Sequence, residues 1–353
     1  MEITQLLIHA FELGASDLHL WVSSKPVLRI DGRLIIQKDF PIISADNMND
    51  TLNIICTPEQ KSLFFRELEL DFGYTISSGV RFRVNVMRQR GSISMAFRVI
   101  PSKIPTIDDL ALPQICKQLI MKPSGMILVT GPTGSGKTTT MAAMIEHLNN
   151  NKSSNVITIE DPIEYLYHNK KCFFAQRDLE DDTRSFASAL KHALRHDPDV
   201  ILIGEMRDIE TISIAIRAAE TGHLVISTLH SVNPPQTIDR LIDVFPSNQQ
   251  NQVRMQVAQT IEGIISQRLI PKASGKGRIA AFEILLGVSS TRNLIRGAEN
   301  HKLSSVMEMG RKDGMVTLDQ SLAELVNEHI IDLDEALLQT NNPENLRKMV
   351  TQY

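Results

Sequence analysis

Residues 131–139 combine glycines, a lysine and hydroxyl groups at the spacing that holds nucleotide phosphates. The segment consists of Gly131, Pro132, Thr133, Gly134, Ser135, Gly136, Lys137, Thr138 and Thr139. Glycines let backbone N–H groups turn inward around phosphates, and a helix N-terminus adds positive potential. We expect Lys137 to reach the β- and γ-phosphates and the Thr138 hydroxyl to bind Mg²⁺. The pattern predicts a P-loop that binds a nucleoside triphosphate.

The segments on either side of this loop support the prediction. Residues 126–130 form a short apolar run of the kind found in buried strands. After the loop, Met141, Met144, Ile145 and Leu148 follow helical spacing. The bare pattern also occurs by chance in glycine-rich loops, but the strand before it and the helix after it favour a phosphate site.

Three carboxylates follow the strand-like run 155–159, namely Glu160, Asp161 and Glu164. Ligands bind at the C-terminal ends of strands in open parallel sheets, and Pro162 ends the strand here. A carboxylate at this place could polarise the water that attacks the γ-phosphate. The alternative is a solvated acidic turn, since acidic loops are common.

A fourth carboxylate follows the next strand-like run, residues 199–203. Glu205 stands where P-loop enzymes carry the Walker B acid, but Gly204 precedes it in place of the usual aspartate. We therefore expect Glu205 to hold Mg²⁺, partly through water, with help from residues 160–164. An idle glutamate at a strand edge is the alternative.

Two histidines bracket the apolar run 224–229, with His223 before it and His230 after it. A single histidine is more often a satisfied polar group than a catalyst, but two of them beside a nucleotide site favour sensing of the γ-phosphate. His192 and His196 have the spacing i, i+4 but lack a third ligand. We interpret them as helix-surface residues and not as a zinc site.

Arginines alternate with apolar residues in 81–86, and the same period of two recurs in 92–99. Two amphipathic strands joined by a turn would place Arg81, Arg83 and Arg98 on one polar face. Such a face is either a solvated sheet surface or a surface that suits an anion.

The composition of this 353-residue chain is that of an ordinary globular protein. A net charge of −4 argues against a dedicated nucleic-acid binder, and we expect no nucleic-acid partner. Cys56, Cys116 and Cys172 lie far apart without a C-x-x-C motif, so we expect neither zinc nor disulfides. No apolar run approaches the ~20 residues that span a bilayer, and the N-terminus lacks a basic signal region. These features predict a cytoplasmic protein.

Patterns along the chain divide it into four expected parts. These are an N-terminal domain over 1–100, a proline-punctuated linker over 101–112, a P-loop core over 113–289 and a helical region over 290–353. The first part should begin with a helix over 1–13 and hold a hairpin of 27–30 and 34–36, with its turn at Asp31-Gly32. In the core, the strand-like runs 126–130, 155–160, 199–203 and 224–228 alternate with helical segments. This alternation indicates the parallel sheet of a RecA-like NTPase.

These blocks, in this order, resemble the secretion NTPases of type II secretion, type IV secretion and type IV pili, and most closely the pilus retraction ATPases. The resemblance covers nearly the whole chain. Its motifs are residues 15–19, 81–85, the P-loop, 159–165 (the family's Asp box), 204–208 (its atypical Walker B), 215–225 (a stretch associated with retraction) and 314–321 (a C-terminal block). Thr138 replaces the more usual serine, and residues 176–180 differ modestly from the common pattern. Neither departure removes the expectation of ATP hydrolysis.

The resemblance implies an α/β fold in which a PAS-like N-terminal domain precedes a RecA-like P-loop NTPase domain with a helical C-terminal part. It also implies ATP and Mg²⁺ as ligands and a homo-hexameric ring. By the same resemblance, Glu164 is the catalytic carboxylate, Glu205 is the Walker B acid, and His223 and His230 bound the His box.

The resemblance gives the arginines a role as well. Arg83 and Arg98 would act in the ring as arginine fingers that reach a nucleotide held by a P-loop. Arg195, Arg217 and Arg240 are further candidates for the subunit interface.

The implied function is an ATP-driven motor for pilus retraction and twitching motility. It would lie at the cytoplasmic face of the inner membrane and act on an inner-membrane platform protein at the pilus base. The alternatives are an accessory retraction paralogue and a pilus assembly or secretion ATPase, although the zinc insertion and long N-terminal extension of the latter are missing. A nucleic-acid motor and a small-molecule kinase are alternatives from other classes.

Overall fold

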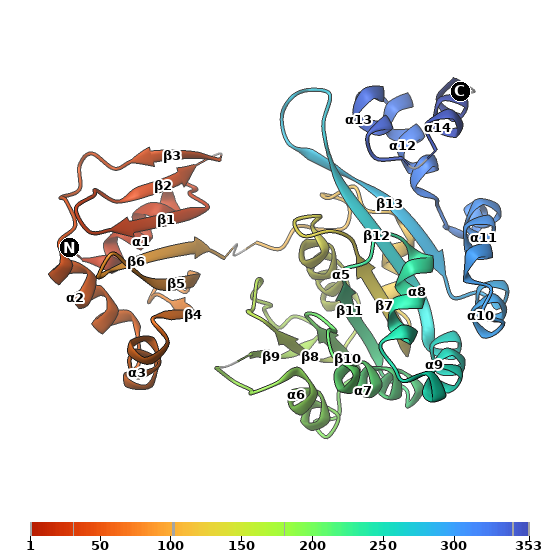
Figure 1. The fold of residues 1–353 in the computed structure, drawn as a ribbon, viewed down its shortest axis with the longest axis horizontal. Helices are drawn as coiled ribbons and strands as arrows, with labels where there is room; N and C mark the ends of the chain where they lie inside the picture. Colours follow the sequence, from red (N-terminus) through yellow and green to blue (C-terminus); the bar gives the residue numbers. More distant parts are fainter. Residues whose placement is uncertain (1, 31, 101–102, 180, 341, 352–353) are drawn as a thin grey trace. The chain divides into compact units, whose positions relative to one another are not determined.

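The computed structural model describes residues 2–30, 32–100, 103–179, 181–340 and 342–351. The chain forms two compact units (Figure 1). The first comprises Met1–Lys103 and Pro162–Leu166, and the second comprises Ile104–Asp161 and Tyr167–Tyr353. The finer division into a PAS-like domain, a linker over 101–112, a core over 113–289 and a helical region stays a prediction, and residues 101–102 lie outside the described residues.

The first unit is built on an antiparallel sheet of six strands in the order β3-β2-β1-β6-β5-β4. Its elements are α1 (Ile3–Glu12), β1 (Asp17–Trp21), β2 (Val27–Ile30), β3 (Arg33–Ile36), α2 (Ala45–Ile55), α3 (Pro58–Glu67), β4 (Glu69–Thr75), β5 (Arg81–Gln89) and β6 (Ser92–Val99). The predicted N-terminal helix and the hairpin of β2 with β3 are confirmed. Asp31, in the predicted turn, lies outside the described residues.

Strand β5 shows why the arginines come to lie on a polar face. Phe82, Val84 and Val86 are buried in the core of the unit, whereas the arginines occupy the alternate positions. In the pairing of β5 with β6, Arg83 lies directly opposite Arg98. The prediction of two amphipathic strands that carry these arginines on one face is confirmed.

The second unit contains a sheet of seven strands in the order β13-β12-β7-β11-β10-β8-β9. All neighbouring pairs are parallel except β12 with β13. The elements up to β11 are α4 (Ile115–Ile120), β7 (Gly125–Thr130), α5 (Lys137–Asn151), β8 (Asn155–Glu160), β9 (Phe173–Asp178), α6 (Phe186–Ala193), β10 (Val200–Ile203), α7 (Ile209–Glu220) and β11 (Leu224–Leu229). The four predicted parallel strands are confirmed as β7, β8, β10 and β11.

Four of these parallel strands end at one edge of the sheet. Thr130, the last residue of β7, lies opposite Leu229 of β11, and Ile203 of β10 lies opposite Ile159 of β8. The same edge therefore carries the P-loop, His230, Glu205 and Glu160. This is the edge at which open parallel sheets bind ligands.

Strands β12 (Ile261–Pro271) and β13 (Arg278–Leu286) were not predicted. Two apolar runs on either side of the glycine- and serine-rich segment 273–277 were the signal for this hairpin. The pairing of β12 with β7 is irregular, because Ile261 lies opposite Met126 while Gly263 lies opposite Ile127. Glu262 is thus an extra residue in β12, as in a β-bulge.

The remaining helices are α8 (Pro234–Asp243), α9 (Ser247–Thr260), α10 (Ser289–Arg296), α11 (Leu303–Met309), α12 (Leu318–Asn327), α13 (Leu333–Leu337) and α14 (Pro343–Thr351), with short 3₁₀ turns at Asn300–Lys302 and Gly310–Asp313. The last three helices share a small apolar core with the hairpin, which includes Ile270, Ala281, Leu322 and Leu346. Among the described residues, no helix has both the length and the apolar character needed to cross a membrane.

Glu283 on β13 is a titratable group close to these C-terminal helices. Burial raises the pKa of its carboxyl to about 7, and the nearby Asp319 adds to the rise while Arg268 opposes it. The unfolded chain binds the proton only below about pH 4.5, the ordinary value. The contribution of this carboxyl to stability is therefore fully present below that pH and is lost as the pH rises to about 7.

We expect Glu283→Gln, which cannot ionise, to be more stable than the wild type above pH 7, by on the order of 2 kcal/mol in the free energy of unfolding. The gap should close as the pH falls toward 5. Denaturant unfolding from pH 5 to 8.5 measures this difference in the free energy of unfolding. Glu328→Gln, at the exposed end of α12, is the control. Parallel stability curves for Glu283→Gln and the wild type would show that the carboxyl is ionised in the folded protein throughout this range.

Candidate nucleotide site

The P-loop has the backbone geometry that its glycines predict. Gly131, Gly134 and Gly136 all have positive φ, at 143°, 78° and 90°. A Cβ on Gly131 would lie 2.4 Å from the backbone oxygen of Gln267, so the sheet leaves no room for a side chain there. Gly136 is the N-cap of α5, which places the loop at the positive end of a fifteen-residue helix.

Lys137 turns back into the loop that precedes it. Its Nζ donates hydrogen bonds to the backbone oxygens of Gly131 at 2.9 Å and Pro132 at 3.0 Å, and the residue is 9% exposed. Thr138 and Thr139 are half-buried in the first turn of α5. The hydroxyl of Ser135 is buried and has no hydrogen-bond partner among the described residues. The loop therefore holds a charged amine and a hydroxyl that phosphate oxygens could bind.

Glu205 forms a charged cluster directly after β10. Arg207 Nη2 lies 2.7 Å from Glu205 Oε2, and His230 Nε2 lies 3.2 Å from Glu205 Oε1. Burial raises the pKa of Glu205, but Arg207 and His230 together outweigh burial and hold the pKa below its ordinary value. This carboxylate is therefore ionised at neutral pH, as a metal ligand must be.

The two histidines lie at opposite ends of β11. The strand runs parallel to β7, whose C-terminal end leads into the P-loop, and Leu224 lies opposite Gly125 at its start. His223 precedes that start and contacts the backbone oxygen of Ala218 through Nδ1 at 2.9 Å. Six residues of strand separate the histidines by roughly 20 Å. The interpretation that both sense the γ-phosphate is wrong for His223, and only His230 lies at the P-loop edge.

The acidic residues after β8 have different surroundings. Glu160 is 4% exposed and accepts a hydrogen bond from Thr158 Oγ1 at 2.7 Å, and Gln176 Nε2 lies 3.4 Å from the same oxygen. Asp161 is exposed. Glu160 is thus a buried, hydrogen-bonded group rather than part of a solvated acidic turn.

Glu164 lies in the first unit, together with the two predicted arginine fingers. Glu164, Arg83 and Arg98 line a cavity of about 160 Å³ there. Arg83 is 3.6 Å from Asp71, and Arg98 is 2.9 Å from Asp17. The side chain of Arg83 is 39% exposed and that of Arg98 is 69% exposed. The predicted site residues thus form two groups, one in each unit.

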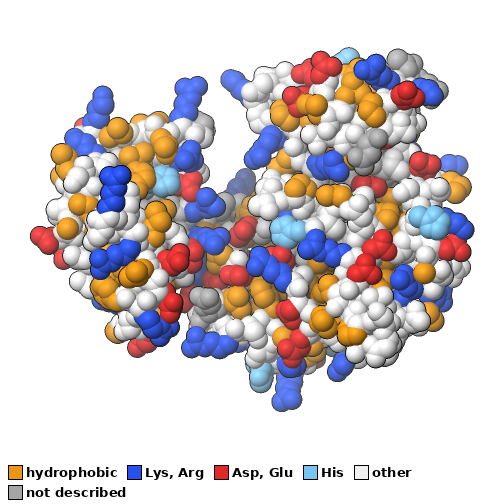
Figure 2. All heavy atoms as spheres, in the orientation of Figure 1, with side chains coloured by type: hydrophobic (Ala, Val, Ile, Leu, Met, Phe, Trp, Pro, Cys, Tyr) orange, Lys and Arg blue, Asp and Glu red, His pale blue; other side chains and the backbone are white. Residues whose placement is uncertain are grey.

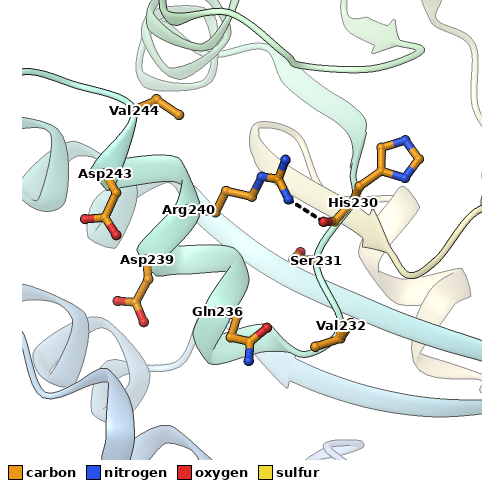
Figure 3. A pocket seen from close by; sticks show the side chains of 8 residues that line it. All are labelled: His230, Ser231, Val232, Gln236, Asp239, Arg240, Asp243 and Val244. Carbon is orange, nitrogen blue, oxygen red and sulfur yellow. Dashed lines mark hydrogen bonds between the residues drawn. The ribbon is translucent and has the colours of Figure 1, made fainter.

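A second cavity, of about 470 Å³, borders His230 and one side of α8 (Figure 3). Arg240 projects toward β11 and donates a hydrogen bond from Nη1 to the backbone oxygen of His230 at 2.6 Å. Asp239 and Asp243 project away from Arg240 in this view. Arg240, predicted as an interface residue, therefore contacts the backbone at a predicted site residue, while Arg195 and Arg217 are exposed elsewhere on the second unit.

Charged side chains of both signs cover the surface. Figure 2 shows Lys and Arg interspersed with Asp and Glu over the visible face of each unit.

His192 is exposed near the end of α6, and His196 lies beyond that helix.

Comparison with known proteins identifies the family of this chain. A family model described as "Type II/IV secretion system protein" matches residues 71–293. The type IV pilus retraction ATPase PilT of Pseudomonas aeruginosa is 43% identical over 345 residues, which cover 98% of this chain and 100% of that protein. The chain belongs to the type II/IV secretion system protein family.

Two further comparisons, one of sequence and one of structure, also match nearly the whole chain. A twitching motility protein of Neisseria gonorrhoeae is 41% identical, over 91% of this chain and 86% of its own length. The crystal structure of the pilus retraction motor PilT with bound ADP superimposes with a TM-score of 0.92 at 43% identity, and covers 99% of both chains. The expected α/β fold, an N-terminal domain followed by a RecA-like P-loop ATPase domain, is confirmed by this match.

Two contacts at the site were not predicted. Arg207 forms an ion pair with Glu205. Its position two residues after this predicted acid could have indicated the contact. Gln267 comes from β12, which pairs with β7, and its side chain contacts the P-loop. The polar run Ser266, Gln267 and Arg268 between apolar residues of β12 was the signal in the sequence, but the contact of Gln267 depends on a pairing between segments far apart in the chain.

Proposed function

We propose that this chain is a Mg²⁺-dependent ATPase that works as a homo-hexameric motor for type IV pilus retraction and twitching motility. The observation that carries the proposal is the whole-length likeness to PilT, in sequence and in fold, together with the P-loop geometry. The motor would act at the cytoplasmic face of the inner membrane on a platform protein at the pilus base. Force would come from a change in the orientation of domains and subunits when ATP binds and is hydrolysed.

In this proposal the P-loop residues, Gly131 to Thr139, hold the phosphates, and Lys137 neutralises their charge. The Thr138 hydroxyl and the ionised Glu205 supply the oxygen ligands that Mg²⁺ prefers, Glu205 partly through water. Mg²⁺, when bound, would stabilise the negative charge of the triphosphate. Glu164 would orient the attacking water, and His230, next to Glu205, would sense the γ-phosphate.

Arg83 and Arg98 would act on the nucleotide of a neighbouring subunit. Arg83 is paired with Asp71 in an ion pair that is exposed on both sides, and such pairs contribute only about 0–1 kcal/mol. Arg83 can therefore leave this pair at small cost to bind a phosphate, whose geometry its forked donors match. Arg98 is paired with Asp17, which is buried but has a second arginine, Arg29, at 3.8 Å.

A mixing experiment tests this arrangement. Arg83→Ala should lower the ATPase rate by about 10³-fold or more without unfolding the subunit. Mixed with subunits that carry Lys137→Ala, which keep Arg83, it should regain up to about a quarter of the wild-type rate, because random rings place some intact arginines beside intact P-loops. Arg33→Ala on the exposed strand β3 is the control. No gain on mixing would mean that Arg83 serves its own subunit or none.

Deletion of the gene, with imaging of pili, tests the biological role. Long pili that do not retract are expected, and the wild-type gene, but not Lys137→Ala, should restore retraction. Bald cells would instead indicate an assembly ATPase, and retraction that continues with reduced force would indicate an accessory paralogue.

Stimulation of the purified ATPase by single-stranded DNA would favour a nucleic-acid motor, and an active strict monomer would favour a small-molecule kinase.

A further inference from the structure

Gln267 joins the P-loop to the strand beside it. The residue lies in β12 directly after Ser266, which is opposite Thr130 at the end of β7, and its side chain is almost completely buried. Its Nε2 donates a hydrogen bond to the backbone oxygen of Ser135 at 2.6 Å. Its Oε1 accepts one from Thr140 Oγ1 at 2.9 Å. Both ends of the amide are therefore used, and each has the polarity that its partner needs.

The contacts span the whole phosphate-binding segment. The backbone oxygen of Gln267 faces Gly131 at the start of the loop. The side-chain amide contacts Ser135 near the end of the loop and Thr140 in the first turn of α5. A Cβ on Gly136 would lie 3.2 Å from Gln267 Nε2, so this amide also packs against the last glycine. Gln267 thus contacts four residues of the loop and the start of α5, two of them through hydrogen bonds.

These contacts bear on phosphate binding through the orientation of peptide groups. A P-loop binds phosphate when its N–H groups point inward, and the Ser135 carbonyl, which shares a peptide group with the Gly136 N–H, must then point outward. A buried carbonyl without a partner is costly, so an outward-pointing Ser135 oxygen needs a donor. Gln267 supplies that donor from a strand of the rigid sheet.

We propose that Gln267 is a positioning residue of the nucleotide site: it holds the Ser135 carbonyl outward and so keeps the N–H groups of the P-loop aimed at the phosphates. The proposal rests on the proposed function, in that the P-loop must bind a nucleotide. Gln267 itself touches no phosphate in this role. Its loss should weaken binding of the phosphates more than it slows the chemical step.

The test uses Gln267→Met, which is similar in size and neutral but makes neither hydrogen bond. We expect the Kd for a fluorescent ADP analogue and the KM for ATP to rise about tenfold, with kcat changed less than threefold. The matched control is Ser266→Ala, which removes a buried hydrogen bond to Thr130 Oγ1 in the same strand pair but leaves the P-loop contacts intact. Ser266→Ala should lower Tm without changing the Kd.

Gln267→Glu provides a second test if Gln267→Met does not fold. It keeps the shape and the bond from Thr140 but replaces the donor to Ser135 with a carboxylate oxygen, and it should weaken nucleotide binding further. A Kd for either folded variant equal to that of the wild type would overturn the positioning role while the proposed function stands. Failure of the wild type to bind the ADP analogue would instead overturn the proposed function.

Discussion

Lys137→Ala should abolish ATP turnover, with a loss of at least about 10³-fold, and should weaken nucleotide binding by tenfold or more. The ammonium group is the one side-chain charge that the P-loop brings to the phosphates, and it acts in a buried place where charge is poorly screened by water. In the present structure it binds two carbonyl oxygens of its own loop, and a phosphate would replace these partners. Release of phosphate and binding of a fluorescent ATP analogue measure the two effects.

Lys152→Ala provides the matched control for this variant. Lys152 caps the other end of α5, roughly 20 Å from the loop by the length of the helix, so its loss should leave turnover unchanged. Melting curves should show that both variants are folded. Hydrolysis at the wild-type rate by folded Lys137→Ala would mean that residues 131–139 are not the site of turnover.

Glu164→Gln should bind ATP as well as the wild type does but hydrolyse it about 10²–10³-fold more slowly. The substitution keeps the size of the side chain and removes only the carboxylate that we propose to orient the attacking water. Glu205→Gln should act differently, because Glu205 is the proposed metal ligand. We expect it to raise the Mg²⁺ concentration needed for half-maximal activity.

Single-turnover hydrolysis across a Mg²⁺ titration separates these two roles. Glu210→Gln on α7, where Glu210 forms an exposed ion pair with Lys191 of α6, is the control and should change neither quantity. If Glu205→Gln abolished turnover at saturating Mg²⁺ while Glu164→Gln kept it, the base would be Glu205. Tight binding of ATP without hydrolysis by Glu164→Gln is the signature that the assignment requires.

Local patterns were sufficient to predict much of this molecule. The P-loop and strands β7, β8, β10 and β11 are encoded in short contiguous runs, and the alternation in β5 placed the arginines on the correct face. The error on His223 was avoidable from the same information. Once β11 is parallel to β7, residues before and after it must lie at opposite edges of the sheet.

Other features depend on contacts that no local pattern encodes. The hydrogen bond that Gln176 donates to the buried Glu160 requires β9 to pair with β8. The role of Gln267 requires β12 to pair with β7, although about 130 residues separate them in the chain. The ion pairs of Arg83 and Arg98 likewise join positions that a motif search treats separately.

The extra residue in β12 decides which side chain meets the P-loop. Successive residues of a strand point to opposite faces, and here Gln267 contacts the loop while Arg268 bonds to the backbone oxygen of Gln339. If β12 paired without the bulge, with Ile261 still opposite Met126, then Glu262 would lie opposite Ile127 and Ser266 would take the place of Gln267. A serine hydroxyl is too short to make both contacts of the Gln267 amide, the one with Ser135 and the one with Thr140. The single extra residue near the start of β12 thus sets which side chain lies against the phosphate-binding loop several residues farther along the strand.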